Sequence, residues 1–188
     1  MFLSIDGLDG SGKSTVSQEL AGMMLRESGE VVVIEHPGEG ILGRTCKRLL
    51  LKEGLPAALF AAGFLSTEMF LSSFRIRRAR SDVVAVRYTL SAFYLPKPVC
   101  RIVYKAFSAV MPRPDAMFFV DVDPETAMER VSSRGGDPEM FENRESMEEI
   151  RSRILSEPGV IVVDGSGTPR ETASLMMSEL EGSRSNIF

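Results

Sequence analysis

Residues 7–15 carry the first pattern in the chain that could do chemistry. They read Gly-Leu-Asp-Gly-Ser-Gly-Lys-Ser-Thr and match the pattern G-x-x-x-x-G-K-[ST]. Glycines at this spacing allow successive backbone N–H groups to converge on a phosphate, and the lysine side chain can bridge two phosphate oxygens. The pattern therefore predicts a loop that binds the phosphates of ATP.

Every residue of this loop is a candidate for ATP binding: Gly7, Leu8, Asp9, Gly10, Ser11, Gly12, Lys13, Ser14 and Thr15. We expect Lys13 to bridge the β- and γ-phosphates and so to take part in catalysis. The hydroxyl of Ser14 is expected to ligate the Mg²⁺ that accompanies ATP, while Thr15 supports the loop. Because the amino end of a helix attracts phosphate, the loop should open a helix.

The flanking sequence contains the elements that such a loop needs. Phe2–Asp6 is a short run of the type found in strands, and Lys13–Glu27 has apolar residues at helical spacing. Four more runs of the buried-strand type follow, at Val31–Ile34, Val83–Val86, Met117–Val122 and Val160–Val163. Helices are predicted between them at Leu42–Lys52, Pro56–Arg80, Pro98–Val110, Pro124–Ser133, Phe141–Leu155 and Pro169–Glu181. This alternation predicts an α/β fold, in which a parallel five-stranded sheet has helices on both faces and binds ligands at the carboxyl ends of its strands.

Composition narrows the class of protein. The chain has 188 residues, of which 44% are apolar and 26% charged, and this suits one globular domain over residues 1–188. A net charge of −4 argues against a basic face for nucleic acid. Two isolated cysteines favour a reduced, cytoplasmic setting. The apolar stretch Ala57–Leu65 is much shorter than the roughly 20 residues that span a bilayer, so we expect no membrane partner.

Three further segments resemble a known family. The first is Val86-Arg87-Tyr88 with Leu90-Ser91, the second is Phe119–Glu125 with Arg130, and the third is Arg134–Glu142. Together with Asp9 in the phosphate loop, they resemble the thymidylate kinases, which belong to the P-loop nucleoside monophosphate kinases. The resemblance covers nearly the whole chain. It implies ATP-dependent phosphorylation of a nucleoside monophosphate, and we expect dTMP to be that acceptor.

The resemblance also implies roles for single residues. Arg134 would lie in a small mobile lid, at about residues 134–143, and would close over the γ-phosphate as a catalytic arginine. Arg130 would line the ATP side of the site. Arg87 would hold the acceptor phosphate and Asp9 the 3′-hydroxyl of its sugar, while Phe60 would stack on the base. Because members of the family are usually homodimers, we expect a homodimer here.

The sequence departs from the family pattern on the acceptor and metal side. Val86 stands where the family has an aspartate close to Mg²⁺, and Gly63-Phe64 replaces a pair that ends in an arginine. Glu35-His36-Pro37 stands where many members have Arg-Glu-Pro. Either Glu35 or Asp121 could supply the missing carboxylate, since both lie at the carboxyl ends of predicted strands, on the same edge of the sheet.

Two other functions stay open on the sequence alone. Glu35, just before a loop proline, resembles the base of deoxynucleoside kinases and would then activate an acceptor hydroxyl. Val86 supplies no carboxylate for the metal. This favours a different function, that of a nucleotide-binding protein that has lost transferase activity. The lid arginine Arg134 and the loop residue Asp9 favour a kinase of the thymidylate type.

Overall fold

The structure is a computed structural model that describes residues 1–52, 54–135 and 141–185. Its sheet has five parallel strands in the order β2-β3-β1-β4-β5. They are β1 (Phe2–Gly7), β2 (Val31–Glu35), β3 (Asp82–Val86), β4 (Ala116–Asp121) and β5 (Val160–Asp164). The predicted sheet is therefore confirmed, and its order places β1, which leads into the phosphate loop, at the centre.

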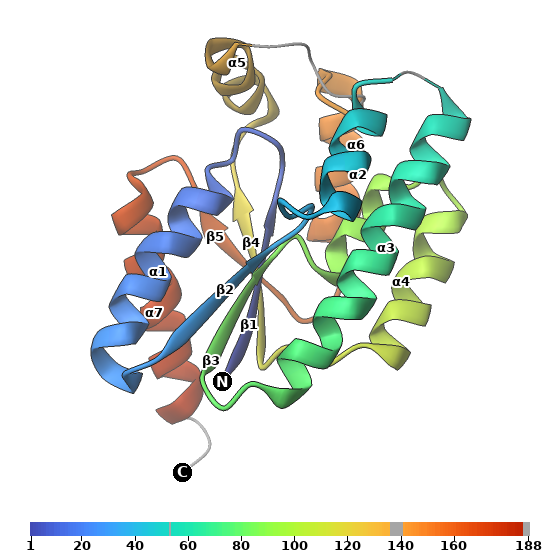
Figure 1. Ribbon diagram of the computed structural model, residues 1–188. Coiled ribbons are helices and arrows are strands. Elements are labelled where there is room, and N and C mark those ends of the chain that lie inside the picture. Colours follow the sequence, from blue (N-terminus) through green and yellow to red (C-terminus); the bar gives the residue numbers. More distant parts are fainter. Residues whose placement is uncertain (53, 136–140, 186–188) are drawn as a thin grey trace.

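The helices cover both faces of this sheet (Figure 1), as predicted. They are α1 (Lys13–Ser28), α2 (Ile41–Leu50), α3 (Leu55–Arg78), α4 (Val99–Val110), α5 (Pro124–Arg134), α6 (Arg144–Leu155) and α7 (Pro169–Ser185). Figure 1 shows α1 and α7 on one face and α3, α4 and α6 on the other. The central strands are mostly apolar because both of their faces are covered; Leu3, Ile5, Val84 and Phe118 are completely buried.

Two local features differ from the sequence prediction. Thr89–Tyr94 forms a 3₁₀ helix, η1, where no element was predicted, since six residues are too few to show a helical period. Helix α6 begins at Arg144 and not at Phe141, because the side-chain Oδ1 of Asn143 accepts a hydrogen bond of 3.0 Å from the N–H of Ser146 and caps the helix.

Helix α3 is longer and more apolar than the stretch Ala57–Leu65 suggested. By length and composition alone, its Pro56–Arg78 part could cross a membrane, with a mean hydropathy of 1.4 in the most apolar 18 residues. This is weak evidence, since helices of soluble domains pass the same test. Met69 and Ile76 on the inner side of α3 are buried in a core cluster with Ile34 and Val83, which belong to β2 and β3. The helix thus packs onto the sheet as part of the folded domain.

Candidate active site

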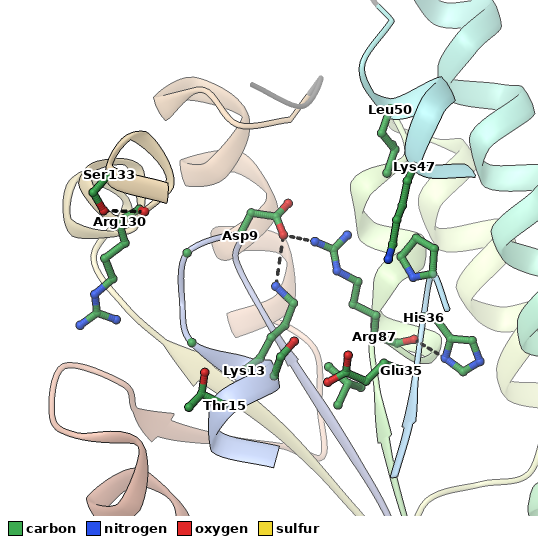
Figure 2. Close-up of a pocket in the computed structure, with 15 residues that line it drawn as sticks. Asp9, Lys13, Thr15, Glu35, His36, Lys47, Leu50, Arg87, Arg130 and Ser133 are labelled. Carbon is green, nitrogen blue, oxygen red and sulfur yellow. Dashed lines mark hydrogen bonds and ion pairs between the residues drawn. The ribbon is translucent and has the colours of Figure 1, made fainter. Parts of the chain in front are cut away.

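A cavity of about 670 Å³ opens at the carboxyl ends of β1, β2 and β3. The phosphate loop lines one side, and Glu35, His36, Val86 and Arg87 line the other. Figure 2 shows Asp9, Lys13 and Arg87 pointing toward one another, with Arg130 of α5 on the other side of the phosphate loop. The parallel sheet causes this convergence, because the ends of all its strands point toward one edge.

The phosphate loop connects β1 directly to α1. Gly10 and Gly12 adopt left-handed backbone conformations, with φ of 81° and 83°, which residues with a side chain rarely adopt. Gly12 is the N-cap of α1 and Lys13 is its first residue. The N–H groups of the first turn and the positive end of the helix dipole therefore face the cavity, which is the arrangement that binds phosphate.

Lys13 turns back over its own loop. Its ammonium group donates to the backbone carbonyl of Leu8 at 3.0 Å and to the Asp9 carboxylate at 3.2 Å. Only 7% of Lys13 is exposed. A buried ammonium group is thereby held at the floor of the cavity, next to the amides that would bind a phosphate.

Asp9 also forms an ion pair with the guanidinium group of Arg87 (Figure 2). Arg87 follows directly after β3 and has a left-handed φ of 55°, the one positive φ of a non-glycine residue in the described chain. Its guanidinium carbon lies 5.6 Å from the ring centre of Tyr94, so the aromatic face supports the cation from the other side. Asp9 therefore links the lysine of the phosphate loop with the arginine predicted to hold the acceptor.

A second, smaller pocket adjoins the cavity at Arg87. Its volume is about 50 Å³, and its lining is mostly apolar, including Leu50, Ala62, Tyr94 and Phe141. Phe141 packs edge-on against Tyr94, with ring centres 5.6 Å apart. Sequence reasoning assigned a role to neither aromatic residue. Tyr94 lies outside the recognised motifs, and Phe141 belongs to the lid-like segment 134–142, in which only Arg134 was given a function.

Asp6 was also missed by the sequence analysis. This carboxyl group is buried at the end of β1, where it accepts hydrogen bonds from the N–H of Tyr88 at 3.3 Å and from the hydroxyl of Ser91 at 3.5 Å. Burial raises the pKa of Asp6 to about 6, although Lys13 and Arg87 act in the opposite direction. Its position immediately before Gly7 was the signal that could have identified it.

The structure does not bring every predicted site residue together. Phe60 is 65% exposed on α3 and lines neither pocket, because the helix turns its neighbours Ala61 and Phe64 inward instead. Arg130 lines the cavity and donates to the carbonyl of Gly165 at 3.4 Å. The side chain of Arg134 and lid residues 136–140 lie outside the described residues.

The two carboxylates suggested in place of Val86 have different surroundings. Both oxygens of Asp121 accept hydrogen bonds from Arg151, at 2.6 and 2.7 Å, so this carboxylate is already paired. Glu35 is exposed, lines the cavity, and pairs with Val86 in the sheet register. Within the described part of the chain, no three His, Cys, Asp or Glu residues form a group that could hold a metal ion by themselves.

The oxygen donors present nevertheless fit Mg²⁺ bound together with a nucleotide. Mg²⁺ prefers hard oxygen ligands and is commonly held by one or two protein groups plus phosphate oxygens and water. The hydroxyl of Ser14 and the carboxylates of Asp9 and Glu35 all line the cavity beside the phosphate loop. A metal that arrives with ATP would find such ligands there.

The fold and the site define a P-loop nucleotide-binding protein with a second pocket beside the phosphate loop. The family model of thymidylate kinase matches residues 5–174. A probable thymidylate kinase of Pyrobaculum aerophilum is 33% identical over 183 residues, covering 92% of both chains. Another, of Archaeoglobus fulgidus, is 29% identical over 175 residues, covering 88% of this chain and 87% of the relative.

The chain therefore belongs to the thymidylate kinase family. A solved structure of thymidylate kinase from Candida albicans superimposes with a TM-score of 0.72 at 19% identity, covering 97% of this chain and 92% of that one, and supports the fold. The predicted family and its class, the nucleoside monophosphate kinases, are both confirmed.

Proposed function

We propose that this protein transfers the γ-phosphoryl group of ATP to dTMP. The observation that carries the proposal is the pair formed by Asp9 and Arg87, which joins the phosphate loop to a second pocket on its far side. A kinase needs two such sites side by side, since the donor and acceptor phosphates must meet in line. Nothing in the site favours an acceptor other than a nucleoside monophosphate.

On the donor side, the amides of the phosphate loop hold the phosphates and Lys13 neutralises their charge. Lys13 then exchanges the Asp9 carboxylate for phosphate oxygens. Ser14 would hold Mg²⁺, which supplies positive charge to the phosphate oxygens when bound. Arg130 lines the ATP side, and Arg134 reaches the transferred group from the lid.

On the acceptor side, Arg87 binds the phosphate of dTMP through its two parallel N–H groups. The apolar pocket beside Tyr94 accepts the base, and Asp9 accepts a hydrogen bond from the sugar hydroxyl. An acceptor phosphate has a second pKa of about 6 and is already ionised near pH 7. Transfer therefore needs positioning and charge stabilisation and no general base, which leaves Glu35 to ligand binding.

The acceptor is best tested by an assay that couples ADP release to a spectroscopic signal. ATP and Mg²⁺ are supplied with dTMP, dUMP, dCMP, UMP or thymidine in turn. We expect the highest kcat/KM with dTMP. Turnover with thymidine alone would overturn the proposal and assign Glu35 as a base. ATP binding without turnover on any acceptor would instead identify a nucleotide-binding protein.

We further propose that residues 1–188 act as one kinase domain in the cytoplasm and assemble as a homodimer through α3. The outer face of this helix exposes five large apolar residues: Leu59, Phe60, Phe70, Leu71 and Phe74. Phe70 and Phe74 pack edge to face, with centres 5.3 Å apart. A contiguous apolar face of this kind is typical of an interaction surface.

Light scattering after size-exclusion chromatography tests the dimer. Phe70→Glu combined with Phe74→Glu should convert the protein to a monomer, because charge on an apolar interface is costly to bury. Ile102→Glu on α4, where Ile102 is 66% exposed, is the matched control and should leave the dimer intact. A wild-type protein that elutes as a monomer at micromolar concentration would refute the proposed assembly.

A further inference from the structure

His36 lies between helix α3 and the acceptor arginine. It follows β2 directly, and only 3% of it is exposed. The ring atom Nδ1 is 3.1 Å from the carbonyl oxygen of Arg87, and Nε2 is 2.8 Å from the hydroxyl oxygen of Ser72 on α3. Figure 2 shows the imidazole pointing at the backbone of Arg87 and away from the phosphate loop.

The backbone of Arg87 is held on each side by a hydrogen bond. Its own N–H donates to the carbonyl of Ile5 at 3.0 Å, and the following N–H, that of Tyr88, donates to the Asp6 carboxylate. The carbonyl of Arg87 between them is the group that His36 contacts. A left-handed conformation costs a residue with a side chain about 1–2 kcal/mol, so such contacts are needed to maintain the φ of 55°.

The tautomer of His36 follows from its two partners. A carbonyl oxygen can only accept, so Nδ1 must carry the proton that binds Arg87. In the neutral ring, Nε2 is then an acceptor. The hydroxyl of Ser72, which lies 2.8 Å from both Nε2 and the carbonyl oxygen of Met69, has one proton, and in this tautomer the proton is directed to Nε2. Burial lowers the pKa of His36, and Arg75 acts in the same direction, whereas Glu68 raises it. The ring is therefore neutral near pH 7, as this arrangement requires.

We propose that His36 is a positioning residue for the acceptor site. Its Nδ1–H holds the carbonyl of Arg87, fixes the backbone conformation there, and thereby sets the direction in which the side chain of Arg87 points. The proposal rests on the assignment of Arg87 to the acceptor phosphate. It goes beyond that assignment by naming the residue that orients this arginine and by connecting it to α3 through Ser72. His36 itself touches neither the transferred group nor the donor.

Two substitutions test the two hydrogen bonds of the His36 ring one at a time. The amide nitrogen of asparagine can take the place of the donor Nδ1, and the amide oxygen of glutamine can take the place of the acceptor Nε2. His36→Asn therefore keeps the contact with Arg87 and loses that with Ser72, while His36→Gln does the reverse. Loss of one buried hydrogen bond should lower acceptor binding by about 3- to 10-fold. We expect this rise in the KM for dTMP in His36→Gln, with the KM for ATP unchanged, and near-normal values in His36→Asn.

The orientation of Arg87 can also be followed without turnover. The NMR signal of its Nε–H group, assigned by its loss in Arg87→Lys, should keep its position in His36→Asn and shift or broaden in His36→Gln. Because this readout needs no substrate, it tests the role of His36 even if dTMP proves not to be the acceptor. Should His36→Gln fail to fold, His36→Leu removes the same contact while filling the space. Equal effects of the Asn and Gln variants, or an equal rise in the KM for ATP, would overturn the proposal.

Discussion

Asp9 and Arg87 lie 78 residues apart in the chain and form an ion pair beside the smaller pocket, which Arg87 also lines. The same carboxylate oxygen of Asp9 also receives the ammonium group of Lys13. The two cations that we propose for the donor and the acceptor phosphates, Lys13 and Arg87, thus share one anion in the described structure. When the two substrates bind, their phosphates compete with Asp9 for these cations, so Asp9 keeps both side chains oriented until then.

Replacement of Arg87 should change the kinetic parameters for the acceptor, dTMP, and not those for the donor, ATP. Loss of one partner of a buried, hydrogen-bonded charge pair costs about 2–5 kcal/mol, so Arg87→Ala should lower kcat/KM for dTMP by at least about 30-fold. Arg87→Lys retains the charge but not the two parallel N–H groups, and an intermediate loss is expected. Steady-state kinetics with each substrate varied in turn measures this. A comparable loss in kcat/KM for ATP would argue that Arg87 serves the donor.

Replacement of Arg134 tests its role as the catalytic arginine of the lid. An arginine that stabilises the transferred phosphoryl group contributes about 10³-fold or more to kcat, and we expect Arg134→Ala to lose that much with little change in dTMP affinity. Arg170→Ala, which removes an exposed arginine on α7, is the control and should retain full activity. An unchanged kcat in Arg134→Ala would exclude this role.

Val86 is 2% exposed and lines the cavity at the end of β3, where a carboxylate would lie close to the phosphate loop. Val86→Asp should reduce the Mg²⁺ concentration for half-maximal rate by about tenfold, a typical effect of a supporting ligand. The matched variant Val86→Asn adds a polar group of the same shape without charge and should show little of this gain. If both variants respond alike, the absence of a carboxylate at position 86 does not limit metal affinity.

Asp6 should lower the free energy of unfolding as pH rises, which is opposite to the usual effect of a carboxyl group in a folded protein. Its pKa of about 6 in the folded protein lies above the ordinary value of 3.8, so the folded state binds this proton more tightly than the unfolded state. The contribution of Asp6 to the free energy of unfolding therefore falls as pH rises from about 4 to above 6, by about 3 kcal/mol in total.

Urea unfolding at several pH values isolates this contribution. Relative to wild type, Asp6→Asn should gain stability progressively across the same pH window, because asparagine does not ionise. Glu19→Gln, on the exposed face of α1, is the control and should show no comparable trend. A constant difference between Asp6→Asn and wild type from pH 4 to pH 7.5 would contradict the raised pKa.

Gly10 and Gly12 have nearly the same φ but different surroundings. A Cβ at Gly10 would lie 2.2 Å from the carbonyl oxygen of Ala127 on α5, whereas at Gly12 nothing lies within 4 Å. Gly12→Ala should lower the free energy of unfolding by about 1–2 kcal/mol through backbone strain. Gly10→Ala should lose about 1–3 kcal/mol more, because α5 must move. Thermal or urea unfolding measures both, and equal losses would show that the contact with α5 has no effect.

The fold could be predicted largely because its signals are local. Most strands are runs of consecutive apolar residues, and the phosphate loop needs only nine neighbouring residues to be recognised. The order of elements then restricts the sheet, since parallel strands must be joined by helices that cover its faces. The position of Arg87 beside the phosphate loop follows from the same reasoning, because Arg87 comes directly after a buried strand.

The outward orientation of Phe60 could not be predicted, for a physical reason. Helix α3 carries large apolar residues on both its buried and its exposed sides, so periodicity does not reveal which of them turn inward. Only packing against α2 decides that Ala61 and Phe64 face the interior.

The sequence by itself determined the phosphate loop, the parallel sheet and the family, since these depend on neighbouring residues or on the order of elements. Tertiary structure alone decided that Asp9 pairs with Arg87, that Asp6 is buried beneath Tyr88, and that His36 reaches the Arg87 carbonyl. Each of these contacts joins residues 51 to 82 positions apart. Such contacts depend on which strands become neighbours in the sheet and on the turn at Arg87, and neither is encoded in any short segment.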